Sequence, residues 1–306
     1  MNQLYQELFN RIDFKRIIDH PNILIAAAFW EEDRYNAAKM CYKYMRAIDD
    51  LIDCHKSAHT IIAENEKASF LQSVNTWIDH IEKPQNYDSG NELLETIRTF
   101  HIPLWPLETF AKSMIYDIDH NGFATISDFI DYSQGASVSP ASIFVHLNGL
   151  RKTRHGYDVP AFDVRDAATP CALFSYIVHI IRDFQKDQHN HLNYFADDVI
   201  TDNGLTHEQL SHIAHGAPIP FGFRNMIRTY YDLAAIYRKK TFEVIENIYP
   251  LLEPRYRLSL MIIFNLYLMV FERINIEKGK FTTEELNPSS EEIKERVYKT
   301  IEDFRE

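Results

Sequence analysis

Apolar residues recur three and four positions apart along most of this 306-residue chain, which is the spacing of the buried face of an α-helix. Only nine glycines occur, and no stretch has the strand, glycine-rich turn and helix of a nucleotide-binding fold. The pattern therefore predicts an all-α protein. Helices are expected over residues 22–56, 61–82, 91–119, 125–150, 166–190, 221–248 and 255–278, with a further charged helix over 289–305.

No linker rich in Gly, Ser or Pro divides the chain and no repeat of fixed period occurs, so a single domain over residues 1–306 is the simplest expectation. No apolar run reaches the length of about 18 residues that indicates a membrane-spanning helix. The run LSLMIIFNLYLMVF at 258–271 is either a core helix or the wall of a pocket. The polar N-terminal segment does not resemble a signal peptide.

Two of the expected helices carry carboxylates on one face. In the first, Tyr42, Arg46, Asp49, Asp50 and Asp53 follow one another at helical spacing, so that three carboxylates and one guanidinium share a single stripe. Ordinary surface charge is the alternative interpretation of such a stripe.

The second acid motif places Asp183 and Asp187 one turn apart, with Arg182 adjacent in sequence but expected to point elsewhere. Like charges at this spacing destabilise a helix by roughly 0.2–0.5 kcal/mol per pair. A magnesium ion would remove this repulsion, because it takes one or two carboxylates and fills its other positions with water and phosphate oxygens. Two such motifs facing each other would hold a diphosphate through bridging metal ions.

The flanks of both acid motifs favour a site over a solvated face. Each helix is apolar on most of its remaining circumference, which indicates a buried helix. Buried carboxylates are unfavourable unless they are paired or bind metal. The apolar residues are Ala37, Ala38, Met40, Cys41, Tyr44, Ile48 and Ile52 in the first helix, and Phe174, Ile177, Val178, Ile180, Ile181 and Phe184 in the second.

Charge and cysteine content narrow the function further. A net charge of −12 argues against nucleic acid as a partner, because phosphate backbones are bound by clustered Lys and Arg. Cys41, Cys54 and Cys171 are scattered and odd in number, which supports neither a disulfide framework nor a zinc site. A cytoplasmic location with reduced thiols is expected, with at most peripheral contact with a membrane.

Residues 117–122 followed by Asp128 have the spacing of an EF-hand calcium loop. Asp128 stands where such a loop has Glu, and no second loop of this kind occurs, although these loops normally work in pairs. The favoured alternative is a helix end, a turn and a new helix capped by Thr125 or Ser127.

Taken together, the acid motifs resemble those of the squalene/phytoene synthase family of head-to-head prenyltransferases. The family's first motif reads Tyr, three residues, Arg, two residues, Asp-Asp, two residues, Asp, which is similar to residues 42–53. Its second motif is similar to IIRDFQKDQ at 180–188, with an aromatic pair at 194–195. The resemblance covers about residues 20–275, and its central segment is similar at Met114, Asp117, Thr125, Phe129 and Tyr132.

This resemblance implies an isoprenoid-synthase-type helical bundle with a central apolar cavity. It implies that two allylic isoprenoid diphosphates condense head to head after magnesium-dependent ionisation. Farnesyl diphosphate is the favoured substrate, giving presqualene diphosphate or a squalene-type C30 product. Mg²⁺ is the implied cofactor, Mn²⁺ is a possible substitute, and a role for NADPH stays open. A monomer or homodimer is expected.

The resemblance also implies residue roles. The implied catalytic residues are Asp49, Asp53, Asp183, Asp187 and Tyr42, although Tyr42 could instead form a structural hydrogen bond to Asp49. The implied metal ligands are Asp49, Asp50, Asp53, Asp183, Asp187 and His179. The implied substrate-binding residues are Arg46, Tyr132, Tyr176, His179 and Arg182.

Several positions depart from the family pattern, mostly around the second acid motif. Tyr176 and His179 stand where the family has amide side chains, and Leu192 stands where it has Arg. A neutral His179 imidazole could replace the amide, whereas its protonation would make the site pH-sensitive. Ala26–Ala28 replace small hydroxyl residues, and the stretch 133–142 matches the family's small residues only in part.

Two alternatives to head-to-head condensation remain from these departures. One is a class I terpene cyclase-like enzyme that ionises a single prenyl diphosphate, since IDDLID also fits a DDxxD metal motif. The other is a catalytically silent relative that serves as a binding or assembly protein. The retention of both acid motifs argues against a silent scaffold, which has no physical need for two buried carboxylate clusters.

Overall fold

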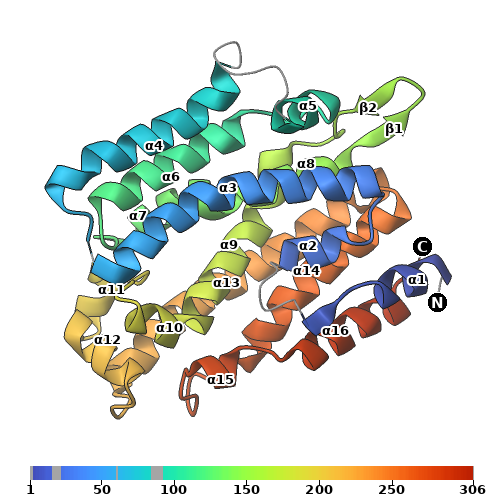
Figure 1. Cartoon of the computed structure of the whole chain (residues 1–306). Helices are drawn as coiled ribbons and strands as arrows, with labels where there is room; N and C mark the ends of the chain where they lie inside the picture. The colour runs from blue at the N-terminus through green and yellow to red at the C-terminus, as the bar shows by residue number, and fades with distance from the viewer. Residues whose placement is uncertain (1–2, 16–21, 60, 84–91, 306) are drawn as a thin grey trace.

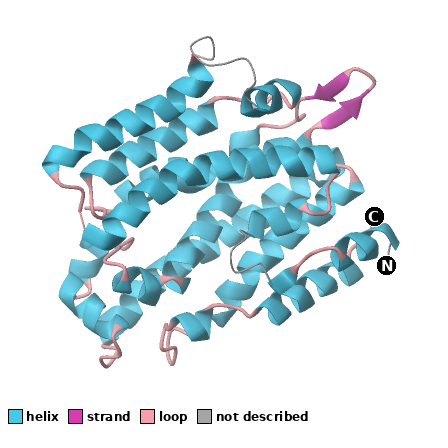
Figure 2. Ribbon diagram, in the orientation of Figure 1, coloured by secondary structure: helices cyan, strands magenta, loops and turns pink. Residues whose placement is uncertain are grey.

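The chain folds into a bundle of α-helices with one small hairpin (Figure 1). This computed structural model describes residues 3–15, 22–59, 61–83 and 92–305. The predicted all-α fold is confirmed, since helices make up most of the described chain and the strands are confined to one small hairpin (Figure 2). The elements are α1 (Gln3–Asn10), α2 (Asn22–Ala27), α3 (Glu32–His59), α4 (Glu64–Glu82), α5 (Glu92–Thr99), α6 (Trp105–Asp119), α7 (Ile126–Ser133), the π-helical turn η3 (Gln134–Val138), α8 (Ser139–Gly149), β1 (Arg151–Thr153), β2 (Gly156–Asp158), α9 (Val164–Arg182), α10 (Phe184–His189), α11 (Asp197–Asp202), α12 (His207–Ala214), α13 (Phe221–Ile248), the 3-10 turn η4 (Tyr249–Leu251), α14 (Pro254–Arg273), α15 (Thr283–Leu286) and α16 (Ser290–Asp303).

The helix bounds agree best where the apolar pattern is long and uninterrupted. The helix expected over 221–248 is α13 without any difference in bounds. The helix expected over 91–119 is divided into α5 and α6, because Pro103 disfavours helical geometry in the residue before it; residue 91 lies outside the described residues. The helix expected over 166–190 is interrupted at Asp183. The helix expected over 22–56 is divided into α2 and α3. The pattern missed α1, the β1–β2 hairpin and the short helices α11, α12 and α15.

The turn between α6 and α7 follows the favoured alternative to a calcium loop. Thr125 caps α7, and its hydroxyl accepts a hydrogen bond from the backbone N–H of Asp128 at 3.2 Å. The Asp128 carboxylate accepts in return from the backbone N–H of Thr125 at 2.9 Å. Asp128 therefore completes a capping box, which holds its carboxylate at the start of the helix.

Packing brings the two acid-bearing segments around a shared neighbour. Helix α9 packs against α8, α13 and α14, whereas α3 packs against α6 and α8, so α8 contacts both acid helices. In Figure 1 α3 runs as one long unbroken helix, while α9 and α10 meet at a junction near α12. Close packing of η3 on α6 requires Gly135, because a Cβ there would lie 2.4 Å from the backbone oxygen of Thr109.

The apolar core forms two large clusters. One joins the N-terminal helices to α8 and α14, and the other joins α9 to α11, α12, α13 and α14. Tyr267 of α14 packs against both clusters. Among the described residues, no helix combines the length and apolar character needed to cross a membrane.

Replacement of Phe174 by Ala is expected to lower the free energy of unfolding by about 3–5 kcal/mol. Phe174 is fully buried, and its ring lies 5.8 Å from that of Phe264 and 5.6 Å from that of Phe271. Urea denaturation measures the loss, with Phe221→Ala as the matched control because Phe221 is 78% exposed. Similar losses in the two variants would contradict this assignment of the core.

Candidate active site

A cavity of about 530 Å³ lies between helices α3, α8, α9, α10, α13 and α14. Four carboxylates line it: Asp49 and Asp53 of α3, Asp183 at the α9–α10 junction, and Asp187 of α10. The expectation that the two acid motifs come together is therefore met within one cavity. The sequence-predicted residues that also line it are Tyr42, Arg46, Tyr132, Tyr176 and His179.

Asp50 and Arg182 are placed differently from the other predicted site residues, because neither lines the cavity. The Asp50 side chain is 52% exposed and forms an ion pair with Arg46. Arg46 also pairs with Asp49, so its guanidinium joins two carboxylates one turn away on α3. No hydrogen bond joins Tyr42 to Asp49 among the described contacts, which leaves the phenol ring of Tyr42 as part of the cavity wall.

The carboxylates of α3 are strongly desolvated. Burial raises the pKa of Asp49 even though the Arg46 guanidinium lowers it. Burial and the neighbouring Asp49 and Asp117 raise the pKa of Asp53 to about 7. The Asp53 side chain makes no hydrogen bond or ion pair to any residue that the structure describes. An ionised Asp53 is thus an unfavourable charge that lacks a partner.

The second acid motif corrects the expected orientation of Arg182. Its guanidinium does not point away: Nε and Nη2 donate to the two carboxylate oxygens of Asp183, each at 2.7 Å. Burial alone would raise the pKa of Asp183, but this bidentate pair outweighs burial and the pKa is lowered. The spacing of one turn is retained across the helix break, because the backbone N–H of Asp187 donates to the oxygen of Asp183 at 2.8 Å.

Asp187, like Asp53, is a buried carboxylate whose pKa is raised. Burial and then the neighbouring Asp183 raise the pKa of Asp187 to about 8, and Asp53 contributes further from the opposite helix. Within the described residues, no hydrogen bond or ion pair reaches the Asp187 carboxylate. Each acid motif therefore contains one carboxylate paired with Arg and one that forms no ion pair with a described residue.

This donor set fits magnesium that is completed by water and phosphate. Across the described ranges, no three His, Cys, Asp or Glu side chains are grouped to hold a metal ion by themselves. Magnesium usually binds to one or two carboxylates and retains several waters or phosphate oxygens, so a complete protein cage is not required. The two carboxylates without partners, Asp53 and Asp187, are the groups whose repulsion a divalent ion would remove.

His179 lines the same cavity in an uncharged form. Burial lowers the pKa of its imidazole to about 3, and the nearby Arg182 guanidinium adds to this effect. Its buried Nε2 has no hydrogen-bond partner in the described part of the chain, and the ring lies edge-on to Tyr267 at 5.1 Å. Of the two forms that the sequence left open for His179, the structure favours the neutral imidazole, which is the form that could replace the amide side chain of the family.

A buried polar cluster near the acid motifs joins Asp117 and Tyr132 to Lys56, which the sequence analysis did not single out. Lys56 of α3 donates from its ammonium group to the backbone oxygens of Asp117 at 3.1 Å and His120 at 2.8 Å. The Tyr132 hydroxyl donates to the Asp117 carboxylate at 2.6 Å. Burial raises the pKa of Asp117 to about 6 although Lys56 opposes this. The only sequence signal for Lys56 is its position three residues after Asp53, on the inner side of α3.

Aromatic rings surround this cluster. Tyr176 stacks on Phe129 with ring centroids 5.5 Å apart, and Tyr132 lies 6.4 Å from Tyr176. Burial raises the pKa values of Tyr132, Tyr176 and Tyr194 well above that of free tyrosine, so the phenols remain protonated. These rings offer neutral π-faces and hydroxyl groups to the cavity.

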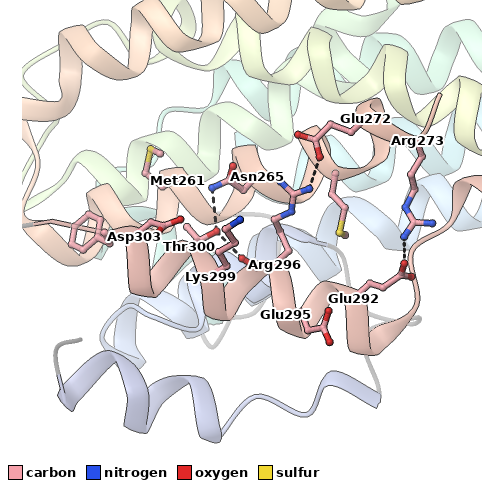
Figure 3. Close-up of a pocket in the computed structure, with 12 residues that line it drawn as sticks. Met261, Asn265, Glu272, Arg273, Glu292, Glu295, Arg296, Lys299, Thr300 and Asp303 are labelled. Atoms are coloured by element: carbon pink, nitrogen blue, oxygen red, sulfur yellow. Dashed lines mark hydrogen bonds and ion pairs between the residues drawn. The ribbon is translucent and has the colours of Figure 1, made fainter. Parts of the chain in front are cut away.

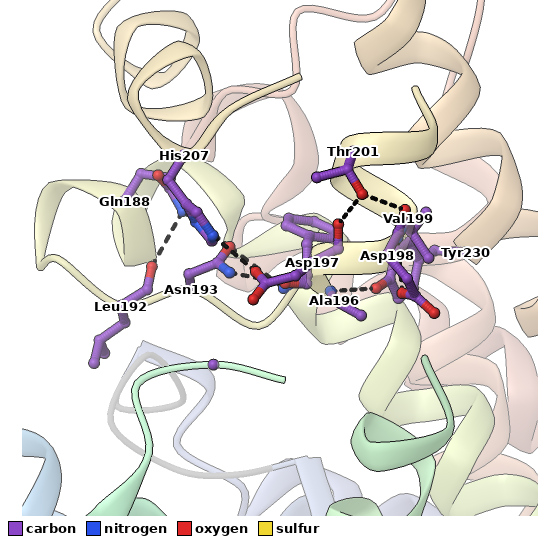
Figure 4. A network of polar contacts seen from close by, with 12 residues as sticks. Gln188, Leu192, Asn193, Ala196, Asp197, Asp198, Val199, Thr201, His207 and Tyr230 are labelled. Carbon is purple, nitrogen blue, oxygen red and sulfur yellow. Dashed lines mark hydrogen bonds and ion pairs between the residues drawn. The ribbon is translucent and has the colours of Figure 1, made fainter. Parts of the chain in front are cut away.

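The segment after α10 is fixed by a network of polar contacts (Figure 4). Asn193 donates to the backbone oxygen of Phe195 at 2.8 Å, and the N–H of Ala196 donates to the Tyr230 hydroxyl at 2.8 Å. Gln188 donates to the oxygen of Leu192 at 3.2 Å. The network holds a segment that contributes Asn190, Leu192 and Tyr194 to the cavity lining.

Most of the remaining lining of the cavity is apolar. The run at 258–271 serves in both of the ways that its sequence allowed, since Leu260, Ile263 and Tyr267 line the cavity while Leu258 and Ile262 are fully buried in the core. Ala26 and Ala27 are also buried and do not line the cavity. Other apolar lining residues are Ile23, Phe110, Phe144, Val145, Val244, Ile245 and Ile248.

A second hollow of about 890 Å³ lies between α14 and α16 (Figure 3). Its charged side chains largely neutralise one another, because Arg273 pairs with Glu292 and Arg296 pairs with Glu272. It contains none of the predicted site residues. The smaller cavity is therefore the candidate active site.

Comparison with solved structures identifies the fold. A dehydrosqualene synthase in complex with ligand matches with a TM-score of 0.66 and 14% identity over 99% of both chains. The squalene synthase HpnC from Alicyclobacillus acidocaldarius matches with a TM-score of 0.65 and 13% identity over 89% of this chain and 94% of its own. YisP from Bacillus subtilis subsp. subtilis strain 168 matches with a TM-score of 0.60 and 12% identity over 97% and 95%.

The chain has the all-α isoprenoid synthase fold. The family model for squalene/phytoene synthase matches residues 20–292. The chain therefore belongs to the squalene/phytoene synthase family. A search of curated proteins gave no match.

Removal of the charge on Asp53 is expected to stabilise the metal-free protein, whereas removal of the charge on Asp183 is expected to destabilise it. At pH 8 in EDTA, Asp53→Asn should raise the free energy of unfolding by about 1–3 kcal/mol, because it replaces a desolvated carboxylate without a partner. Asp183→Asn should lower it by about 3 kcal/mol, because it leaves the buried Arg182 uncompensated. Urea denaturation measures both, and changes of the same sign would contradict this charge arrangement.

Proposed function

We propose that this protein condenses two allylic isoprenoid diphosphates head to head, with farnesyl diphosphate as the favoured substrate. The observation that carries the proposal is the single cavity with two facing acid motifs at one end and an apolar wall at the other. Diphosphate head groups match the acid end through divalent metal ions, and isoprenoid tails match the apolar wall.

The acid residues have distinct tasks in this proposal. Asp49, Asp53, Asp183 and Asp187 hold divalent ions, and Arg182 positions Asp183 through its bidentate contact. Magnesium, with manganese as a substitute, supplies positive charge that stabilises the departing diphosphate. Asp50 is not included among these metal ligands, because it is exposed, pairs with Arg46 and does not line the cavity.

The wall of the cavity protects a cationic reaction. When the C–O bond of one substrate breaks, its electron pair leaves with the diphosphate and an allylic cation remains. The double bond of the second substrate attacks this cation, and loss of a proton gives a cyclopropyl diphosphate. The apolar lining excludes water during these steps, and each aromatic face, such as those of Tyr42, Tyr132 and Tyr176, stabilises a cation by about 0.5–2 kcal/mol.

The direct test is incubation of the purified protein with magnesium and, separately, farnesyl and geranylgeranyl diphosphate, with and without NADPH. Mass spectrometry of the organic extract and a pyrophosphate assay measure the outcome. A C30 product from farnesyl diphosphate is expected, and the samples with NADPH decide whether a reductive step ends the reaction. A C15 or C20 hydrocarbon or alcohol would replace the proposal by a reaction of one substrate, and the absence of product and pyrophosphate would favour a silent relative.

Asp49→Asn and Asp187→Asn are each expected to lower turnover about a hundredfold or more, because each removes a charge that holds the metal and diphosphate. Circular dichroism should show unchanged helicity. Asp202→Asn is the matched control, since Asp202 is exposed on α11 and does not line the cavity. Loss of helicity together with activity would count against a catalytic role.

Chelation of divalent ions with EDTA is expected to abolish pyrophosphate release, and added Mg²⁺ or Mn²⁺ should restore it, because Asp53 and Asp187 are desolvated carboxylates that form no ion pair with a described residue. Calcium is the matched control ion, since it carries the same charge but takes longer and more numerous oxygen contacts. Full activity in EDTA would contradict the proposed metal dependence.

A further inference from the structure

The cavity lining contains few positively charged side chains that could bind phosphate directly. Among the described lining residues, Arg46 and Lys186 are the Lys and Arg side chains, against four carboxylates. Arg46 lies on α3 and already pairs with Asp49 and Asp50. Positive charge for a diphosphate on the α10 side of the cavity therefore depends on Lys186.

Other candidates on the α10 side are occupied or uncharged. The Arg182 guanidinium is engaged by both carboxylate oxygens of Asp183 and does not line the cavity. The His179 imidazole is neutral near pH 7. Leu192, whose backbone N–H donates to the oxygen of Asp187 at 2.9 Å, presents an apolar side chain to the cavity.

Lys186 lowers the pKa of both Asp183 and Asp187 through its charge, but it is not held by either of them. Its side chain makes no hydrogen bond or ion pair to any residue in the described ranges. The preceding residue, Gln185, joins α10 to two neighbouring segments. Its amide nitrogen donates to the backbone oxygen of Ala214 at 3.0 Å, and its amide oxygen accepts from the N–H of Thr283 at 2.9 Å. Lys186 thus extends from a fixed helix, between Asp183 and Asp187 in sequence.

We propose that Lys186 binds the diphosphate of the substrate from the α10 side, with its ammonium group donating to non-bridging phosphate oxygens. This inference rests on the proposed function and adds a binding residue to it. Lys186 supplies a positive charge on the α10 side of the cavity, where the side chain of Leu192 is apolar. Arg46 supplies the corresponding positive charge on the α3 side. A flexible ammonium group with three donors suits this task because it can follow a phosphate group as the substrate moves.

A simpler role for Lys186 is electrostatic screening of the neighbouring aspartates, and it predicts a different result. A cation that only screens carboxylates competes with divalent ions, so its removal would strengthen metal binding and leave pyrophosphate binding unchanged or stronger. A cation that binds phosphate gives the opposite response for pyrophosphate. A purely structural role would weaken the binding of both ligands.

The test is isothermal titration calorimetry of Lys186→Met with two probes, Mn²⁺ alone and inorganic pyrophosphate at saturating Mg²⁺. We expect pyrophosphate affinity to fall about tenfold, while Mn²⁺ affinity is unchanged or higher. Lys186→Arg should retain most of the pyrophosphate affinity. Lys43→Met is the matched control, because Lys43 is exposed on α3 and does not line the cavity.

A second variant tests whether position 192 faces the same phosphate. In Lys186→Met/Leu192→Arg, a guanidinium is placed on the same cavity wall, and at least half of the lost binding free energy for pyrophosphate should return. Restoration would support binding of phosphate by a cation on this wall. Failure of this variant to bind better than Lys186→Met would contradict that placement.

The outcomes separate the two proposals. If wild-type protein binds pyrophosphate with Mg²⁺ and Lys186→Met binds it equally well, the role of Lys186 is wrong and the proposed function stands. A parallel loss of Mn²⁺ and pyrophosphate affinity in Lys186→Met also overturns it in favour of a structural role. If wild-type protein binds no pyrophosphate at any Mg²⁺ concentration, the proposed function fails and the role of Lys186 fails with it.

Discussion

The main constraint on this structure is that helix packing must hold several carboxylates in a poorly solvated cavity, where they repel one another. The charge of Asp53 on α3 raises the pKa of Asp187 on α10, and neither carboxylate forms a hydrogen bond or ion pair with a residue that the structure describes. Packing of the surrounding helices must outweigh this repulsion in the folded state. A protein retains such an unfavourable pair where the charge is needed by a ligand.

Two arginines limit the repulsion and divide each acid motif into two parts. Arg46 neutralises Asp49, and Arg182 neutralises Asp183, so that one carboxylate in each motif is held in a fixed geometry. The other two carboxylates, Asp53 and Asp187, form no ion pair with a described residue. The cavity is thus organised by pairs of unlike residues rather than by four equivalent acids, and the long helix α3 and the α9–α10 junction each present one such pair.

Much of the fold and of the acid site was predictable because it depends on periodic spacing. The long helices follow from apolar residues at helical intervals, and so does the placement of Asp49 with Asp53 and of Asp183 with Asp187 one turn apart. That both acid motifs line one cavity was implied by their shared chemistry and by the family resemblance, not by spacing. Features that depend on tertiary contacts were not predictable. The helix break at Asp183 and the bidentate contact of Arg182 arise from packing around α10, and periodicity alone made Arg182 point elsewhere. The burial that keeps His179 neutral depends on residues distant in sequence.

The separation of the two acid motifs along the chain has a consequence for mass action. Only long-range packing brings α3 and α10 to the same cavity. The unfolded chain therefore does not bring Asp53 near Asp187 and offers no comparable binding site. A divalent ion that binds there binds the native state alone, so ligand and fold are thermodynamically linked. At a free ion concentration one hundred times the dissociation constant, this linkage adds about 2.7 kcal/mol to the free energy of unfolding. The ion concentration of the surrounding solution would then regulate the lifetime of the folded protein as well as its chemistry.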